Sequence, residues 1–525
     1  MSDLALLSVP STRRPSALLS LPSELILEIF SHYASNTPTK PGSTPENALR
    51  FYPLALVCKR LHPFAMSFIY AEYSESPDNL TPFLLNPSLW KYVQKIEFPW
   101  IPEVSKFSPA TGRFPLLPVI QEFALEEAWP EALFEGMCMG SIGVDNFERA
   151  AIMCHARNVR ELSIGLVENP YEKYMLPSLY SPPRQRSLPS ARNKDQVLHS
   201  LDPILYAARG QQFGNVHRFE NLHTLRIDMR RLVLKQISSI FRLPSLRVLA
   251  LGAKRYLTFT ELSEGDISSW EFPPGTSSIQ CLEIHRLKVE PSDTVLATQS
   301  CRALKSFVHS ELSFPSWEGQ YSILLEVARQ HKDSLQELKV YNSRCHNYKA
   351  SLGDALASLI HLQRLELPFG LLTGDYDENS YKSLPFPCFD DLTRVLPTSL
   401  VHLSLDISAP YPPPDSTTKA FRNILSSHHH QTPPFPNLKT IDLVVRISDV
   451  ETPLPMDFVL LDRLFAEHDR GIKFTYNLNI NTTHGVPFLR NAFNYLSQLP
   501  DGMELVRHSE ILVGYKEFLM RTNQT

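Results

Sequence analysis

The segment Leu246-Arg-Val-Leu-Ala-Leu251 has the form apolar-x-x-apolar-x-apolar, and this form recurs along most of the chain. The other good copies are Val159-Arg-Glu-Leu-Ser-Ile164, Leu222-His-Thr-Leu-Arg-Ile227, Ile279-Gln-Cys-Leu-Glu-Ile284, Leu335-Gln-Glu-Leu-Lys-Val340, Leu362-Gln-Arg-Leu-Glu-Leu367, Leu400-Val-His-Leu-Ser-Leu405 and Leu438-Lys-Thr-Ile-Asp-Leu443. Val93–Phe98 and Leu304–Val308 are poorer copies. The fourth and sixth positions of a copy are apolar, as in a short strand with one buried face. We therefore predict a strand at each copy.

Helical stretches separate several copies, most clearly Tyr321–His331 and Leu352–Ile360. From Leu222 onward, with the poorer copy included, the copies begin 24 to 38 residues apart. This alternation resembles degenerate leucine-rich repeats, which form a solenoid with parallel strands on its concave face. The resemblance implies an α/β fold whose concave face carries polar strand residues such as Arg247, Lys339 and Arg364. An ordinary α/β domain with a parallel sheet is the alternative, because it would give similar local patterns.

One position departs from the usual repeat. The asparagine expected three positions after the strand is replaced by Leu287 in one copy and by Ser343 in another. The backbone turn must then be satisfied by other groups, so we expect irregular curvature.

The N-terminal part of the chain predicts a small helical unit. Leu21-Pro22 opens the first helix, since proline suits a first helical position, and the helix should end near Tyr33. Two pairs at i, i+4 give it apolar faces: Leu25 with Ile29, and Ile26 with Phe30.

A second and a third helix follow the loop 37–47. The second is predicted from Tyr52 onward, with apolar residues at i, i+3, i+4 and i+7: Leu54, Val57, Cys58 and Leu61. Pro63 ends it or opens the third helix, which has Phe64, Phe68 and Ile69 on one side. Three helices this short cannot bury all these faces against one another, so a partner helix or the following domain must cover the remainder.

The stretches LLSLPSELILEIFSHYA (18–34) and FYPLALVCKRLHPFAMSFIY (51–70) together resemble the F-box, as found in F-box proteins of the fungal type. The resemblance implies binding to the Skp-type adaptor of a cullin-based ubiquitin ligase, with an unknown protein target held by the domain that follows. It also implies that a set of residues forms or supports the adaptor-binding surface: Leu21, Pro22, Leu25, Ile29, Leu54, Val57, Cys58 and Leu61. The loop 35–50 is longer than is usual in that family.

The predicted organisation has five parts. Residues 1–18 are a disordered leader, 19–75 the three-helix F-box-like module, 76–150 a connecting or capping segment, 151–470 the irregular leucine-rich-repeat array and 471–525 a C-terminal cap. The function that this organisation implies is that of a non-enzymatic substrate-recognition subunit. A repeat-based interaction scaffold acting outside ubiquitination is the alternative.

The composition gives no sign of other partners. The formal net charge of −4 offers no whole-molecule reason to expect nucleic acid or an anionic membrane. No secretory signal and no run of about 18 apolar residues is present, which favours the cytoplasm or nucleus. The basic cluster Arg226, Arg230, Arg231 and Lys235 lacks interleaved aromatic residues and is interpreted as a solvated face.

No motif for catalysis, a metal or a cofactor stands out. The seven cysteines contain no Cys-x-x-Cys pair, and His428–His430 are adjacent residues in a proline-rich loop. Gly136-Met-Cys138-Met-Gly140 has the spacing of a nucleophile elbow, but a predicted helix precedes it where that motif requires a strand. We therefore expect no catalytic residue, no metal and no cofactor.

Overall fold

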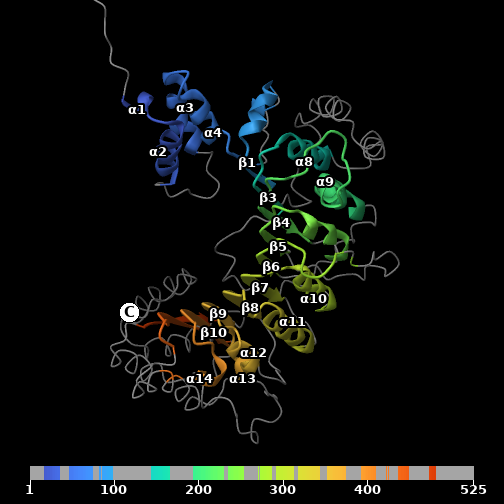
Figure 1. Cartoon of the computed structure of the whole chain (residues 1–525), viewed down its shortest axis with the longest axis vertical. Helices are drawn as coiled ribbons and strands as arrows, with labels where there is room; N and C mark the ends of the chain where they lie inside the picture. The colour runs from blue at the N-terminus through green and yellow to red at the C-terminus, as the bar shows by residue number, and fades with distance from the viewer. Residues whose placement is uncertain are drawn as a thin grey trace, which may run out of the picture.

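The computed structural model describes residues 17–35, 46–74, 82–83, 85–98, 144–165, 193–229, 234–252, 270, 272–285, 291–311, 317–342, 352–373, 392–408, 421, 424, 435–447 and 472–480. In these ranges the chain forms one all-parallel sheet of 12 strands whose order follows the chain from β1 to β12. Each strand therefore pairs only with its sequence neighbours, and the order never reverses as it would in a doubly wound sheet. The fold is α/β and its strand order is compatible with a solenoid (Figure 1).

The strands are short and regularly paired. They are β1 (Glu72–Ser74), β2 (Lys95–Phe98), β3 (Glu161–Ile164), β4 (Thr224–Asp228), β5 (Val248–Gly252), β6 (Cys281–His285), β7 (Ser306–Glu311), β8 (Glu337–Asn342), β9 (Arg364–Pro368), β10 (His402–Ser408), β11 (Thr440–Ile447) and β12 (Lys473–Ile480). Every copy of the repeated form, the poorer two included, coincides with one of β2 to β11, which confirms those strand predictions.

Helices follow most of the strands and stack along one side of the array (Figure 1). They are η1 (Pro87–Tyr92), α8 (Val144–His155), α9 (Asn193–Ala208), η3 (Leu234–Arg242), α10 (Pro291–Ser300), α11 (Trp317–Gln330), α12 (Gly353–Ala357), α13 (Phe369–Thr373) and α14 (Leu392–Val395). The helices predicted at 321–331 and 352–360 correspond to α11 and α12.

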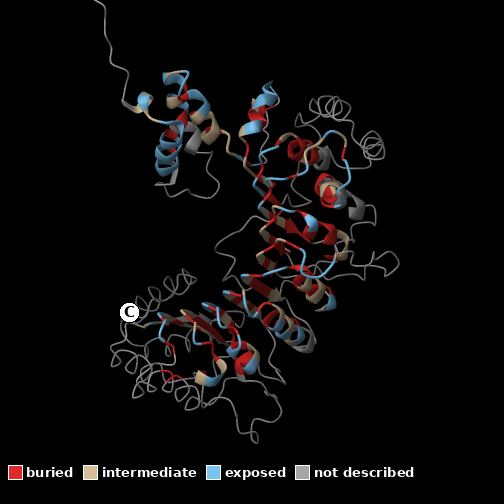
Figure 2. Cartoon of the chain, viewed as in Figure 1, coloured by how far each residue is buried: buried red, intermediate tan, exposed pale blue. Residues whose placement is uncertain are grey.

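Apolar residues in register form the core. Leu225 of β4 lies opposite Leu249 of β5, which lies opposite Leu282 of β6, and all three are fully buried. The same column continues through the fourth position of every copy from Ile96 to Ile441, and Figure 2 shows buried residues running along the interior of the array. Burying one such side chain contributes about 1.5–3 kcal/mol to folding. The column therefore stabilises the packing of each repeat on its neighbour.

A backbone ladder runs along the amino-terminal edge of the sheet. The carbonyl of Arg160, just before β3, accepts hydrogen bonds from the amides of His223 (2.8 Å) and Thr224 (2.9 Å) in the next repeat. The carbonyl of His223 then accepts from Arg247 (2.8 Å) and Val248 (2.9 Å). This two-donor arrangement repeats at the carbonyls of Ala71, Gln94, Arg247, Gln280, Lys305, Gln336, Gln363 and Val401. Successive repeats are thus held in one register however long the segment between them.

Asparagine and serine side chains add a second set of bonds at this edge. The residue directly before a copy often donates to a backbone carbonyl of the preceding repeat: Asn158 to Lys91 (2.7 Å), Ser278 to Leu246 (2.9 Å), Ser334 to Leu304 (2.8 Å) and Ser399 to Leu362 (2.8 Å). These bonds tie the turn before each of these strands to the preceding repeat.

The N-terminal helices form a separate small core. They are α1 (Ala17–Ser20), α2 (Ser23–Ser35), α3 (Glu46–Val57) and α4 (His62–Ile69). The second helix was predicted to start at Tyr52 and to include Leu61, but α3 begins at Glu46, contains Pro53 and ends at Val57. Pro63 opens α4, as one of its two sequence interpretations required.

The junction between these helices and the sheet is short. Two residues separate α4 from β1, and Tyr70 stacks edge-on against Phe83 with ring centroids 5.4 Å apart. Met66 and Tyr70 pack against both cores. The sheet thus begins at Glu72, within the range 19–75 that was assigned to the N-terminal module.

The sixth positions of the copies form a second buried column along the sheet. His309 stands in this column, where the other copies have an apolar residue. It lies on β7 between Ile284 of β6 and Val340 of β8, and 4% of it is exposed. No hydrogen-bond partner of its Nδ1 exists among the described residues. Burial, with a smaller contribution from His285, lowers the pKa of His309 to about 4.

We predict that His309→Leu makes the protein less sensitive to acid. The unfolded His309 has a pKa near 6.5, so its protonation favours the unfolded state as the pH falls from about 6.5 toward 4. The wild type should lose about 2 kcal/mol through this group at about pH 5, and the variant should not. Thermal denaturation at about pH 7.5 and pH 5 measures this. The control is His361→Leu, which replaces an exposed histidine. If the loss of Tm between about pH 7.5 and pH 5 were the same in His309→Leu as in the wild type, His309 would not be the source of the acid sensitivity.

Candidate functional site

The N-terminal helices bury one set of apolar residues and expose another. The buried set packs around three aromatic rings: Phe30 lies 5.4 Å from Phe51 and 5.9 Å from Phe68, and Phe51 stacks on Phe68 at 4.9 Å. Ile26, Ala55, Leu61, Ala65 and Ile69 complete this core. Because these residues fill the interior, the remaining apolar side chains of α2 and α3 lie outside it.

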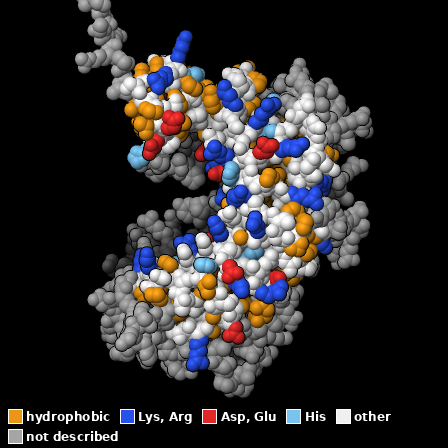
Figure 3. Space-filling model, in the orientation of Figure 1, with side chains coloured by type: hydrophobic (Ala, Val, Ile, Leu, Met, Phe, Trp, Pro, Cys, Tyr) orange, Lys and Arg blue, Asp and Glu red, His pale blue; other side chains and the backbone are white. Residues whose placement is uncertain are grey.

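The exposed set is concentrated on α2 and α3. Of ten exposed large hydrophobic residues in the described part of the chain, seven lie on these two helices: Leu25, Leu27, Ile29, Tyr33, Tyr52, Leu56 and Val57. Figure 3 shows hydrophobic side chains gathered on the visible face of this region. Leu25, Ile29 and Tyr33 are spaced at i, i+4 and i+8, so they form one stripe along α2. A concentration of this kind is typical of a protein-interaction surface.

The predicted adaptor-binding residues differ in how far they are exposed. Pro22, Leu25, Ile29 and Val57 are exposed, and Leu21, Leu54 and Cys58 are partly buried against the core. Leu61 is 2% exposed, so it can support the surface from below but cannot contact a partner.

Sequence reasoning missed several members of this surface. Leu27, Tyr33, Tyr52 and Leu56 are exposed by at least 40%. Tyr52 and Leu56 are spaced at i, i+4 on α3, but the predicted apolar face included only Leu54, Val57, Cys58 and Leu61.

Arg60, in the turn after α3, is hydrogen-bonded to the segment just before α2. Its guanidinium donates to the carbonyls of Leu19 and Leu21, the latter at 2.7 Å. His62 Nδ1 lies 3.1 Å from the carbonyl oxygen of Ala55. These bonds fix the ends of α2 and α3, and so position the exposed residues on both helices.

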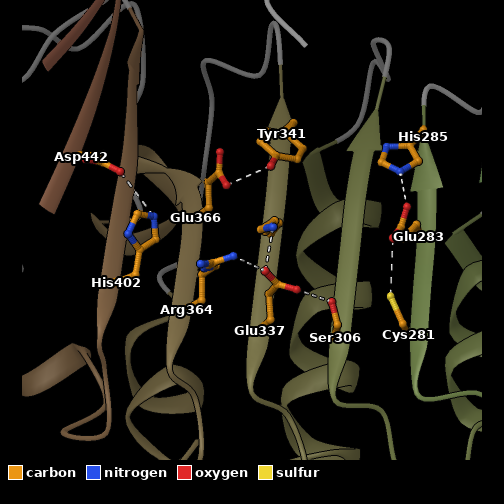
Figure 4. Close-up of polar contacts among 11 residues, drawn as sticks. Cys281, Glu283, His285, Ser306, Glu337, Tyr341, Arg364, Glu366, His402 and Asp442 are labelled. Atoms are coloured by element: carbon orange, nitrogen blue, oxygen red, sulfur yellow. Dashed lines mark hydrogen bonds and ion pairs between the residues drawn. The ribbon is translucent and has the colours of Figure 1, made fainter. Parts of the chain in front are cut away.

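The polar face of the sheet is a second candidate surface, because its carboxylates are held by donors on neighbouring strands (Figure 4). Glu337 of β8 accepts from Lys339 at 2.7 Å, from Ser306 of β7 at 2.7 Å and from Arg364 of β9 at 3.3 Å. Tyr341 donates to Glu366 at 2.9 Å. Burial alone would raise the pKa of Glu337, but the bonds from Lys339 and Ser306 outweigh it, and the pKa is lowered.

The network continues on both sides of β8. On β6, His285 lies 3.1 Å from Glu283, and Cys281 Sγ lies 3.6 Å from the same carboxylate. Burial, together with the charge of Glu283, raises the pKa of Cys281 to about 12, so its thiol stays protonated and is a poor nucleophile. On β10, His402 lies 3.5 Å from Asp442 of β11. The face therefore offers fixed hydrogen-bonding groups to a partner.

Lys339 and Arg364 lie on this polar face as expected, but Arg247 does not belong to the same network. Arg247 precedes β5, and its Nη1 donates to the carbonyl of Pro244 at 3.0 Å. It therefore lies at the amino-terminal edge of the sheet.

The described residues contain neither a metal-binding cluster nor a membrane-spanning helix. Within the described ranges, no three His, Cys, Asp or Glu side chains lie close enough together to hold a metal ion. The same ranges contain no helix with the length and apolar character needed to cross a membrane. Cys138, with its flanking glycines, and His428–His430 lie outside the described residues.

A comparison with protein-family models and a comparison with curated proteins found no match to this chain.

We predict that Leu61→Ala and Val57→Ala differ sharply in their effect on the N-terminal helices. Leu61→Ala leaves a cavity in the core and should cost about 2–5 kcal/mol, whereas Val57→Ala removes an exposed side chain and should cost less than about 0.5 kcal/mol. Amide hydrogen exchange in α2 to α4 measures both. Equal loss of protection in the two variants would contradict the division into buried and exposed sets.

Proposed function

We propose that the protein is a substrate-recognition subunit of a Skp–cullin–F-box-type ubiquitin ligase. In this proposal the exposed apolar residues of α2 and α3 bind the Skp-type adaptor, and the strand array, taken as leucine-rich repeats, binds a protein target. No side chain performs bond chemistry, because the subunit acts by raising the effective concentration of the target near the ligase.

The observation that carries the proposal is the position of the exposed apolar residues. They lie on the two helices whose sequence resembles the F-box, and Pro22, Leu25, Ile29 and Val57 belong both to that resemblance and to the exposed set. Only three other large hydrophobic residues are exposed in the described remainder of the chain: Leu85, Leu325 and Ile360. Exposing this surface to water is unfavourable, which supports a partner that covers it.

The short junction also supports the proposal. Since Tyr70 and Met66 pack against both cores, a partner bound to α2 and α3 would be held at a defined position relative to the array. A fixed geometry of this kind is what a subunit that presents a target requires.

We predict that Leu25→Asp with Ile29→Asp abolishes binding of a purified fungal Skp-type adaptor. Both residues are exposed by about 45%, so the substitutions leave the core intact while placing charges in the contact. Isothermal titration should show at least a hundredfold weaker binding, about 3 kcal/mol, for the double variant. The matched control is Leu325→Asp with Ile360→Asp, which charges exposed apolar residues of the array.

Loss of binding in both double variants, or in neither, would contradict the proposal. If adaptor binding behaves as expected, reconstituted ubiquitin transfer with adaptor and cullin separates the ligase subunit from a scaffold that acts outside ubiquitination. Transfer that depends on Leu25 and Ile29 favours the ligase subunit, and adaptor binding without transfer favours the scaffold.

A further inference from the structure

The residues directly before the strands form a row along the amino-terminal edge of the sheet. The backbone ladder puts them on successive rungs, so that Arg160, His223, Arg247, Gln280 and Lys305 follow one another from β3 to β7. Parallel strands lie about 4.8 Å apart, so this row is about 19 Å long.

This row is rich in positive charge. Arg160 and Lys305 are exposed, and Arg157 and Arg302, each three residues earlier in the same repeats, are exposed as well. Together with Arg247 they form what we term the basic edge. Across the part of the chain that the structure describes, Arg157, Arg160, Arg302 and Lys305 have no ion-pair partner.

Acidic residues do little to balance the basic edge. Between Arg157 and Arg302, the exposed carboxylates of the described repeats are Glu161 and Glu220, the latter three residues before His223. Asp333 lies beyond Lys305, before β8. Glu161 lies opposite Lys95 in the register of β2 and β3, on the polar face of the sheet. The edge is therefore locally positive although the whole chain has a net charge of −4.

The polar face differs from the basic edge in this respect. Lys339 and Arg364 there are already bonded to Glu337, and Lys95 lies 2.9 Å from Glu97. An acidic partner at that face would have to displace existing ion pairs, whereas Arg157, Arg160, Arg302 and Lys305 at the edge have no ion pair to displace among the described residues.

The side chains between the cations favour a peptide over a nucleic acid. Gln280 sits on the rung between Arg247 and Lys305, and its amide can both donate to and accept from a peptide backbone, whereas phosphates only accept. No exposed Phe, Tyr or Trp side chain lies at this edge in the described residues, so His223 is the one exposed ring there on which a base could stack.

We propose that the basic edge binds an acidic segment of a protein in extended conformation. Since an extended chain advances about 3.3 Å per residue, a segment of about six residues spans the row from Arg160 to Lys305. Its carboxylates pair with Arg157, Arg160, Arg302 and Lys305. The inference rests on the proposed function only in taking this segment to be part of the target.

The test uses the full-length protein without adaptor and a fluorescein-labelled peptide of about ten alternating Glu and Ser residues. Fluorescence anisotropy should show binding that weakens as salt is raised. Arg160→Glu with Lys305→Glu should weaken it about tenfold or more, because two attractive contacts become repulsive. Arg329→Glu with Lys473→Glu makes the same change in net charge away from the edge and should change the affinity less than about twofold.

Failure of the wild type to bind the peptide, or equal weakening in both double variants, would overturn the proposal. Tighter binding of a single-stranded oligonucleotide than of the acidic peptide would overturn the choice of a protein segment. If the charge reversals unfold the protein, Arg160→Gln with Lys305→Gln replaces them. Leu25→Asp with Ile29→Asp should bind the peptide normally, so the two proposals can fail separately.

Discussion

The backbone ladder at the amino-terminal edge is the interaction on which the rest of the array depends. Each carbonyl in it accepts from two amides of the next repeat, and the ladder runs without interruption from Ala71 to the amides of Lys439 and Thr440. It fixes the register in which Leu225, Leu249 and Leu282 meet, and therefore the core. Its first carbonyl belongs to Ala71, two residues after α4, so the N-terminal helices are attached directly to the start of the ladder.

Much of this fold could be predicted from the sequence because the repeated form encodes burial at fixed positions. The strands from β2 to β11 followed from apolar residues such as Leu365 and Leu403, whose alternation needs no tertiary information. β1 was missed because Tyr73 stands alone in a strand of three residues, too short for a periodic signal. The role of Asn158 and Ser278 was also missed. Their side chains lie just before each copy, outside the repeated apolar form, so that form does not mark them.

The candidate site was only partly predictable for a related reason. The spacing of Leu54, Val57 and Leu61 indicated one helical face, but the helix ends at Val57, so Leu61 turns into the core while Val57 faces solvent. Contacts distant in sequence, such as those of Arg60 with Leu19 and Leu21, also shape this region, and local periodicity does not encode them. The same limit applies to Arg247, which the pattern assigned to the concave face and which instead bonds to Pro244 at the edge.

The central claim is that a partner covers the apolar residues of α2 and α3 while the array stays open. Hydrogen–deuterium exchange of the full-length protein with and without a purified fungal Skp-type adaptor tests it most directly. The account predicts slower exchange on adding the adaptor in α2 and α3, and unchanged exchange in β4 to β10. Protection confined to the strands, or no change in either helix at saturating adaptor, would contradict it.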